Sequence, residues 1–464
     1  MQPTISIPPA PAGLLRRLEE AGYEAYVVGG CVRDSLRGAA PDDWDICTSA
    51  RPEQTAACFS HERVVPTGVD HGTVTVVIDG VGYEITTFRT EGGYADHRHP
   101  DRVEFVASVT DDLSRRDFTV NAMAYHPQRG LRDPFGGRED LSRRMIRCVG
   151  CPKERFEEDA LRILRALRFA SQLDFSLEEE TARAVRAMAP ALCSLPGERV
   201  GSELKKLLCG PGAGRVLMDF WPVFGCMIPD LRPLEGAPQD NPHHCYTMDR
   251  HTAEAVGFAP PVPAVRLCML FHDIAKPRCR TTDAHGVGHY KGHPARSAEM
   301  AEHWLKALRF DRATIDRVCL LIRYHDERFD PGTAEVKRML GLLGPQALEQ
   351  LLWVQRADAL AKGNGRGAAA AIRRIDAALA ERERILREGE CYSLAGLAVS
   401  GDDLLRAGLR SGPGVGRCLH RLLDQVIAGA LPNQKEALMG YFCDQLLPQE
   451  GVEPYPPESP RRGL

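Results

Sequence analysis

Two aspartates near the N-terminus, Asp43 and Asp45, have the spacing of residues that act together on a cation. In an extended strand, residues i and i+2 point to one face, so both carboxylates are expected to project side by side. Two like charges held this close need a cation, and Mg²⁺ prefers carboxylate and water oxygens to nitrogen or sulfur. An isolated Asp-x-Asp is more typical of a solvated surface turn, so the preceding residues decide its interpretation.

The stretch before the pair predicts a phosphate-binding turn. Tyr26 to Val28 form an apolar run typical of a buried strand, Gly29-Gly30 indicates a tight turn, and Cys31 to Arg37 follows as a short helix. Backbone N–H groups at a helix N-terminus lack intrahelical partners, glycine lets a ligand approach closely, and Arg33 adds a positive charge. Together with the aspartate pair, this spacing favours a nucleotide-phosphate site over a surface turn.

A predicted hairpin supplies a third carboxylate. Thr73 to Ile78 and Val81 to Phe88 flank Asp79-Gly80, a strong hairpin-turn signal. Glu84, in the second strand, is expected beside the aspartate pair. Two or three carboxylates next to a phosphate turn suit two-metal phosphoryl transfer, in which ions roughly 3.5–4 Å apart activate the attacking oxygen and steady the leaving pyrophosphate.

The composition is that of an ordinary globular protein of several domains. The 464 residues are 43% hydrophobic and 26% charged, with a formal net charge of -4. Overall positive charge therefore cannot hold nucleic acid, and any polyanion needs a local basic surface. No apolar stretch approaches the roughly 20 residues of a membrane helix, and Met1 to Leu15 lacks the features of a signal peptide. We expect a cytoplasmic protein without membrane contact.

The cysteines are interpreted as reduced thiols, most of them small core residues. All fifteen occur singly except for Cys148-x-x-Cys151. This pair has no second pair at zinc-finger spacing, which favours a chance occurrence over a metal or redox site. Its role is left open.

The head motifs resemble the signature of the nucleotidyltransferase superfamily typified by polymerase β, and more narrowly the class II tRNA nucleotidyltransferases and bacterial poly(A) polymerases. Arg115 to Ala122 (RRDFTVNA) resembles the segment that binds the ribose and phosphates of the nucleotide. The resemblance implies that Arg116 contacts the nucleotide, that Asp117 contacts the ribose, and that Asn121 belongs to the same pocket. Asp133 to Gly137 resembles the linker that couples head and neck in this family.

A further motif, Glu158 to Arg162 (EDALR), resembles the segment that in this family pairs with the Watson–Crick edge of the incoming base. Asp159 and Arg162 are three residues apart and are expected to share a helix face, with an acceptor beside a forked donor. That pair can meet the edges of cytosine and adenine, whereas guanine and uracil present the wrong polarity. Arg165 and Arg168 continue the face by helical spacing and would meet the triphosphate.

Two other stretches follow the pattern of the family. The charged segment Glu91 to Pro100 resembles the loop that acts as a lever in CCA-adding members when the pocket switches from C to A. The segment with Glu198, Arg199 and Glu203 resembles a helix that braces the nucleotide-binding helix. The charged loop favours complete CCA addition.

A second constellation, farther along the chain, consists of Asp249 to Thr252, Phe271 to Lys276, Gly292-His293, Tyr324 to Asp326 and Arg356 to Asp358. In this order the segments resemble an HD-type metal-dependent phosphohydrolase domain. The best ligand set is His251, His272, Asp273 and Asp358. Two imidazoles and two carboxylates suit a divalent transition metal such as Mn, Ni or Fe, or Mg less tightly. His293 and His325 are candidates for a second ion or a phosphate contact.

The expected fold class is α+β, with a small polymerase-β-like nucleotidyltransferase head that contains a mixed sheet, followed by all-α neck, HD and tail domains. Within the head, helix is expected from Asp111 onward, with a turn-rich break over Pro127 to Gly137. The predicted domains are a head (1–148), a neck with the base-binding helix (149–210), a body with the HD domain (211–390), a tRNA-binding helical tail (391–450) and a disordered end (451–464).

The resemblance covers roughly residues 20 to 440 and implies template-independent addition of CCA to the 3′ end of tRNA from CTP and ATP, with release of pyrophosphate. Mg²⁺ is the expected metal of the head, and tRNA, CTP and ATP are the expected partners. The oligomeric state is left open. Two alternatives also stay open: a poly(A) polymerase or partial (CC-only or A-only) enzyme with the same motifs, and an HD phosphohydrolase whose head senses nucleotides.

Overall fold

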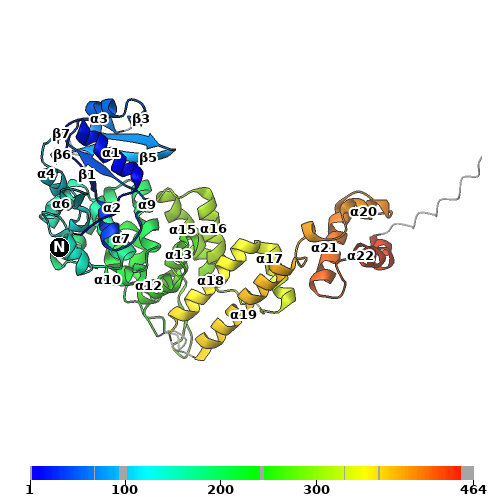
Figure 1. Ribbon diagram of the computed structural model, residues 1–464. Coiled ribbons are helices and arrows are strands. Elements are labelled where there is room, and N and C mark those ends of the chain that lie inside the picture. The colour runs from blue at the N-terminus through cyan, green and yellow to red at the C-terminus, as the bar shows by residue number, and fades with distance from the viewer. Residues whose placement is uncertain are drawn as a thin grey trace, which may run out of the picture.

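The computed structural model describes residues 3–66, 68–92, 102–240, 245–328, 330–363 and 366–450. Figure 1 shows the chain running in sequence order from a head with the main sheet, through a body of packed helices, to a small helical tail. Most of the predicted lever loop (residues 93–101) and the predicted disordered end (451–464) lie outside the described residues. No helix in the described ranges is long and apolar enough to cross a membrane.

A seven-stranded sheet forms the centre of the head. Its strands are β1 (Ala25–Val28), β2 (Ile46–Thr48), β3 (Arg63–Val65), β4 (Thr73–Ile78), β5 (Val81–Thr87), β8 (Ala124–His126) and β9 (Gly130–Arg132). They lie in the order β3-β4-β5-β2-β1-β8-β9, with β2 and β5 parallel and the other neighbours antiparallel. The mixed sheet is confirmed, but β8 and β9 occupy a region predicted as helix and turn.

The predicted hairpin between β4 and β5 is confirmed. Asp79 and Gly80 adopt positive φ angles of 50° and 82°, the conformation that a tight two-residue hairpin turn requires. A second antiparallel hairpin is formed by β6 (Arg89–Gly92) and β7 (Arg102–Phe105). The helices of the head are α1 (Pro9–Glu20), α2 (Gly30–Leu36), α3 (Pro52–Cys58), α4 (Val109–Ser114) and α5 (Gly137–Ser142).

Helices dominate after residue 150, as predicted. Those of the neck are α6 (Pro152–Glu158), α7 (Leu161–Leu173), α8 (Glu179–Met188) and α9 (Gly197–Leu208). Those of the body are α10 (Ala213–Asp219), α11 (Trp221–Met227), α12 (Met248–Phe258), α13 (Pro263–Phe271), α14 (Lys276–Cys279), α15 (His293–Ala307), α16 (Arg312–Tyr324), α17 (Thr333–Leu343), α18 (Pro345–Ala361) and α19 (Arg366–Glu388). Two short strand pairs interrupt them, β10 (Met145–Ile146) with β11 (Ser176–Leu177) and β12 (Thr281–Thr282) with β13 (Gly288–His289).

One hydrophobic core runs from the head into the body, between Ile5 and Ile385. A second core, between Cys391 and Leu447, holds the tail together. The tail helices are α20 (Gly401–Arg406), α21 (Pro413–Ile427) and α22 (Lys435–Tyr441), and Figure 1 shows α19 leading from the body towards them. The predicted boundaries at residues 148 and 210 lie within the first core, whereas the one at residue 390 falls between the two cores.

Helix α9 approaches the end of α15 more closely than side chains would allow. A Cβ atom at Gly197 would lie 2.0 Å from the carbonyl oxygen of Ala307, and one at Gly201 would lie 2.3 Å from that of Leu308. These contacts therefore require glycine at both positions. Because α9 also packs against α7, this single helix joins the neck to the body.

Candidate functional site

The three predicted carboxylates of the head lie near one another, Glu84 on β5 and the two aspartates just before β2. Strand β2 begins at Ile46, so Asp43 and Asp45 precede the strand instead of lying within it, and that part of the prediction is wrong. The sheet still holds the backbone at Asp45, because its carbonyl oxygen accepts a hydrogen bond from the last residue of β1 at 3.0 Å. Parallel pairing of Ile46 with Ile85 places Asp45 next to Glu84.

The pKa of Asp45 is raised to about 6. Burial is the main cause, the Asp43 and Glu84 carboxylates add to it, and Arg116 opposes it. Asp43 and Glu84 are exposed, and Asp45 is partly buried. A group of this kind is short of positive charge, and its oxygen donors fit Mg²⁺.

Gly29 and Gly30 form the expected turn between β1 and α2. Gly29 has a φ of 78°, and a Cβ atom there would lie 3.1 Å from Nη1 of Arg116, so glycine leaves room for that guanidinium. Arg33, in the last turn of the short helix α2, donates from Nη1 to Oδ1 of Asn121 at 2.7 Å. The structure thus brings the turn together with the predicted nucleotide-binding segment.

Asp117 is the centre of a buried polar network. Its carboxylate pairs with Arg165 of α7 at 2.5 Å and accepts a hydrogen bond from Nδ2 of Asn121 at 3.2 Å. Burial by itself would raise the pKa of Asp117, but Arg165 and Asn121 outweigh it and lower the pKa to about 2. Asp117 is therefore an ionised acceptor that links the head to the neck.

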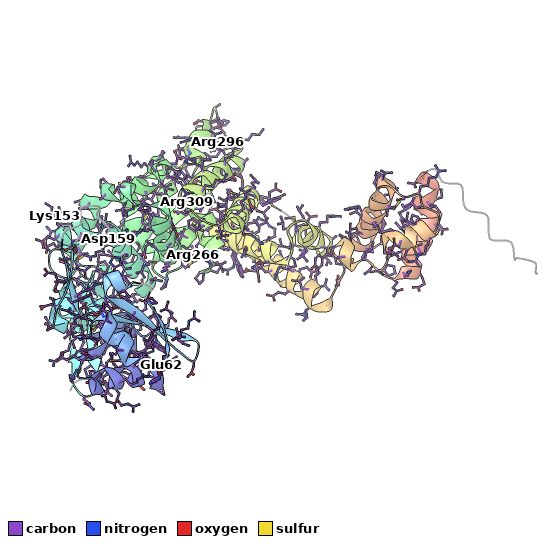
Figure 2. All side chains as sticks on the ribbon, turned by 90° about the horizontal axis from the view of Figure 1, so that it is seen from above. Glu62, Lys153, Asp159, Arg266, Arg296 and Arg309 are labelled. Atoms are coloured by element: carbon purple, nitrogen blue, oxygen red, sulfur yellow. The ribbon has the colours of Figure 1, made fainter. Side chains whose placement is uncertain are left out.

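Asp159 does not share a helix face with Arg162, which corrects the prediction. Helix α6 ends at Glu158, Asp159 is extended with φ -141° and ψ 105°, and α7 begins at Leu161. Oδ1 of Asp159 accepts a hydrogen bond from the Leu161 N–H at 3.0 Å. The preference of Asp for helix caps was a signal for this break. Figure 2 shows Asp159 where the cyan head meets the green neck.

Ion pairs hold both side chains of this motif. Oδ2 of Asp159 accepts a hydrogen bond from Nη2 of Arg199 on α9 at 2.8 Å, and Arg162 pairs with Glu158. Arg162 also donates to the carbonyl oxygen of Arg115 in the head at 3.3 Å. Different neighbours therefore position the two side chains: α9 holds Asp159, whereas Glu158 and the backbone of the head hold Arg162.

Arg165 and Arg168 follow Arg162 along α7 and are paired in the same way. Arg168 pairs with Glu203 of α9 at 2.5 Å and lies over the ring of Phe169, 3.8 Å from its centroid. Each of the three arginines thus has a carboxylate partner. Any phosphate group that binds these guanidinium groups must compete with those carboxylates.

Our sequence interpretation missed Asp112, which holds two arginines of the head. The side chain is fully buried, at 0% exposed, and pairs with Arg115 at 2.7 Å and with Arg116 at 3.3 Å. An acid three and four residues before two arginines is typical of helical ion pairs. That spacing was the available signal.

A second cluster, buried in the body, unites the residues of the predicted HD-type set. Its members are His251 on α12, His272 and Asp273 directly after α13, His293 at the start of α15, His325 directly after α16 and Asp358 on α18. Donor atoms from five of these side chains form two groups that could each hold a metal ion, His251 with His272 and Asp273, and Asp273 with His293 and His325. Asp358, predicted as a ligand, is in neither group, although its Oδ1 lies 3.1 Å from Nε2 of His251. Segments that lie far apart in the sequence therefore supply one compact site.

Asp273 is shared by the two groups of donor atoms. Nε2 of His251 and Nε2 of His272 lie 3.5 and 3.2 Å from Oδ2 of Asp273. Nε2 of His293 and Nε2 of His325 lie 3.2 and 3.9 Å from Oδ1. Oδ1 has no hydrogen-bond partner among the described residues, although Asp273 is only 2% exposed. An ionised oxygen buried in this way is costly unless a cation lies beside it.

All four imidazoles present the same nitrogen to the cluster. In each of them Nδ1 lies between 2.6 and 3.2 Å from a backbone carbonyl oxygen, which places the proton on Nδ1 and directs the Nε2 lone pair at the cluster. The Nε2 atoms of His251 and His272 are 3.3 Å apart, as are those of His293 and His325. Lone pairs this close repel one another, so the donor set fits divalent cations.

Two lysines balance the carboxylates of the cluster. Lys276 pairs with Asp273 at 2.7 Å, and Lys362 pairs with Asp358 at 2.5 Å. Burial would raise the pKa of both aspartates, but neighbouring positive charge, from Lys276 beside Asp273 and from Lys362 beside Asp358, opposes it, and both pKa values lie well below the usual range. Both aspartates are therefore ionised.

Three family models match the chain. Residues 25–147 match the poly(A) polymerase head domain, residues 174–221 match the probable RNA and SrmB-binding site of polymerase A, and residues 295–442 match the putative tRNA nucleotidyltransferase domain 2. With the sheet and carboxylates described above, these matches place the head in the class of poly(A)-polymerase-type nucleotidyltransferases.

Similar proteins narrow this class to one family. A CCA-adding enzyme of Levilactobacillus brevis is 35% identical over 432 residues, which are 93% of this chain and 96% of the relative. The chain belongs to the CCA-adding enzyme family. A CCA-adding enzyme of Limosilactobacillus reuteri is 50% identical over 218 residues, 47% of this chain and 53% of the relative. The match thus spans about half the length of that relative and of several others.

Solved structures share the architecture. The Bacillus stearothermophilus CCA-adding enzyme in complex with CTP has a TM-score of 0.67 at 28% identity, and the match covers 96% of this chain and 99% of that one. The Thermotoga maritima CCA-adding enzyme complexed with tRNA has a TM-score of 0.57 at 20% identity, covering 94% and 95%. The latter likeness shows a shared fold, and both agree with the α+β prediction.

Proposed function

We propose that this chain adds CCA to the 3′ end of tRNA, with CTP and ATP as substrates and pyrophosphate as the released product. The observation that carries the proposal is that the head sheet brings Asp43 and Asp45 to Glu84, while Arg162 of the base-selecting motif contacts the same head. The similar proteins are CCA-adding enzymes, and one was solved with CTP. The 3′-hydroxyl of the tRNA is the nucleophile, so no covalent enzyme intermediate is expected.

Asp43, Asp45 and Glu84 are proposed to hold Mg²⁺. The set offers oxygen donors, which this ion prefers, and the raised pKa of Asp45 indicates a group that lacks positive charge. When bound, the metal stabilises charge on the attacking oxygen and on the leaving pyrophosphate. The part played by the protein is to fix the three carboxylates through the register between β2 and β5.

Asp159 and Arg162 are proposed to select the base. The carboxylate accepts and the guanidinium donates, a combination that meets the edges of cytosine and adenine. Arg199 restrains the acceptor from α9, and Glu158 restrains the donor. Base choice therefore depends on one ion pair that joins Asp159 to α9 and one that joins Arg162 to the end of α6, and not on a regular helix face.

The other pocket residues are proposed to hold the phosphates and the sugar. Those beside the phosphates are Gly29, Gly30, Arg33, Arg116, Arg165 and Arg168, and those beside the ribose are Asp117 and Asn121. An ionised carboxylate is an acceptor for ribose hydroxyl groups. Guanidinium groups bind phosphate through charge-assisted hydrogen bonds, at the cost of loosening their present carboxylate partners.

The test is incubation of the purified full chain with tRNA that lacks CCA, with CTP alone, ATP alone and both, followed by sequencing of the tRNA 3′ end. We expect CC from CTP and CCA from the two together. No incorporation of C would contradict the proposal. Runs of A would favour a poly(A) polymerase, and a stop after CC or addition of A alone would favour a partial enzyme.

We further propose that the body cluster binds a divalent metal and hydrolyses phosphoesters. The unpartnered Oδ1 of Asp273 and the converging Nε2 atoms favour this second activity. Nitrogen donors favour Mn, Ni or Fe over Mg. Elemental analysis of the purified chain and hydrolysis of bis(p-nitrophenyl) phosphate check the two steps. Absence of metal after supply of each ion would contradict the proposal.

We propose that the chain acts in the cytoplasm. No disulfide joins any of the described cysteines, which fits a reducing compartment. The proposed substrate, tRNA, fits the same location. Localisation of a fluorescent fusion in a host cell checks this, and a secreted product would contradict it.

A further inference from the structure

Several parts of the head meet at the end of helix α4. Oδ1 of Asp112 accepts hydrogen bonds from Nη2 and Nε of Arg115 at 2.7 and 3.1 Å, and from the backbone N–H of Arg89 at 3.4 Å. Oδ2 accepts a hydrogen bond from Nη2 of Arg116 at 3.3 Å. One fully buried carboxylate therefore holds two guanidinium groups and the first residue of β6.

Arg116 reaches from this carboxylate to the nucleotide pocket. Its Nη1 lies 3.1 Å from the Cβ position of Gly29, and its charge acts on Asp45. Its Nε is buried without a hydrogen-bond partner among the described residues. Asp112 thus fixes a guanidinium between the phosphate turn and the aspartates proposed to hold Mg²⁺.

The same carboxylate fixes the base of the β6–β7 hairpin. Nε of Arg115, the residue directly after α4, donates to the carbonyl oxygen of Arg89 at 3.1 Å. Asp112 and Arg115 thus hold both backbone polar groups of Arg89. On the opposite strand, Phe105 pairs with Arg89, and its ring lies 2.7 Å from the Cβ position of Gly72. Both strands of the hairpin are therefore anchored where they leave the head.

We infer that Asp112 is a positioning residue that couples the orientation of Arg116 in the nucleotide pocket to the base of the β6–β7 hairpin. The inference rests on the proposed nucleotidyl transfer and adds to it a side chain that touches no substrate. A triphosphate that draws Arg116 away leaves Arg115 as the remaining charged partner of Asp112. The hydrogen bonds from Arg115 to that carboxylate then strengthen, which tightens the hold on Arg89.

The first test compares Asp112→Asn with Asp111→Asn, an exposed neighbour on the same helix, in the full chain. Asparagine keeps the size and an acceptor but removes the charge. Asp112→Asn should raise the KM for CTP about tenfold with a smaller change in kcat, whereas Asp111→Asn should match the wild type. A lower melting temperature with an unchanged KM would mean a purely structural role and would overturn the inference.

The second test follows the hairpin by hydrogen–deuterium exchange of residues 89–92. Saturating CTP should slow this exchange in the wild type. The slowing should be lost in Arg115→Gln, in which the bond between Asp112 and Arg116 remains. Unchanged exchange in the wild type would overturn the coupling, even if Asp112→Asn does not fold. Failure of the wild type to incorporate C would instead contradict the proposed function, so the two failures are distinguishable.

Discussion

The carboxylate group of the head and the histidine–aspartate cluster of the body both bring acidic side chains together. They differ in how deeply they are buried and in the atoms that they offer to a metal. Asp43 and Glu84 are exposed and offer oxygen, whereas His251 and His272 are 0% exposed and offer nitrogen. An open oxygen site suits Mg²⁺, which keeps several waters and shares its shell with substrates. A closed site with mixed nitrogen and oxygen donors suits a transition-metal ion. The two sites therefore differ in the metal that their burial and ligand chemistry favour.

The largest effect is expected on the head side, for Asp45→Asn. Loss of one carboxylate from the group of three should slow addition of C by about 10³-fold or more, while the metal content of the body cluster stays at the wild-type level. Single-turnover incorporation of CTP and elemental analysis measure the two quantities. Asp42→Asn, at an exposed neighbour, is the matched control. Addition within tenfold of the wild type would show that these carboxylates do not hold the metal.

The body side is tested by His272→Ala. Removing one of the converging imidazoles should weaken metal retention about 100-fold and leave addition of C within about twofold of the wild type. Elemental analysis after desalting and the tRNA assay check this, with His303→Ala, an exposed histidine of α15, as the control. If metal and nucleotide addition are lost together, the two sites are not independent.

Asp159→Ala probes the neck, which lies between the two regions. Discrimination of C and A against U and G should fall by about 10–100-fold, more than overall turnover falls, because the acceptor for the base edge is lost. Values of kcat/KM for the four nucleotides give the answer. Glu157→Gln, an exposed acid two residues earlier, should behave as the wild type. Unchanged selectivity would contradict the role of Asp159 in base choice.

The smallest expected effect is the pH dependence of thermal stability that Asp45 causes in the head. The pKa of Asp45 is about 6, above the ordinary 3.8. Between these two pH values the folded protein holds a proton on Asp45 that the unfolded chain has released. The contribution of this proton to the free energy of unfolding is therefore lost as the pH rises through 6. In a chelator, Asp45→Asn should melt about 2–4 °C above the wild type at pH 8, and the gap should narrow towards pH 5. Mg²⁺ should reduce the gap at pH 8. A gap independent of pH would contradict this account.

Features that depend on neighbours in the sequence were predictable. Asp79-Gly80 needs positive φ angles for a tight turn, and the structure has them. The strand that carries Glu84 was predictable from the same hairpin signal, whereas its place beside Asp45 depends on the pairing of β5 with β2. The interpretation failed where the backbone leaves a regular element: Asp43 and Asp45 precede their strand, and Asp159 lies in a break between two helices. Spacing rules assume a continuous element, so they cannot locate such a break.

Pairs that only the tertiary fold creates could not be predicted. Asp117 meets Arg165 across 48 residues, and Arg33 meets Asn121 across 88. No periodicity in the sequence indicates that residues this far apart along the chain meet. More of the body cluster could be predicted, because histidine and aspartate are residue types that bind metals. Their residue types identified them as candidates, although their separation along the chain did not show that they meet.

The glycine contacts between α9 and α15 bear on how this chain can be recombined with others. Because backbone meets backbone at Gly197 and Gly201, the fit depends on the path of residues 307–308 and not on side chains that can adapt. The same helix carries Arg199 and Glu203, which restrain the neck. A chimera that joins this head and neck to the body of another protein keeps these residues but loses the backbone surface against which α9 packs. Exchange should therefore succeed best near residue 390, where the two hydrophobic cores separate.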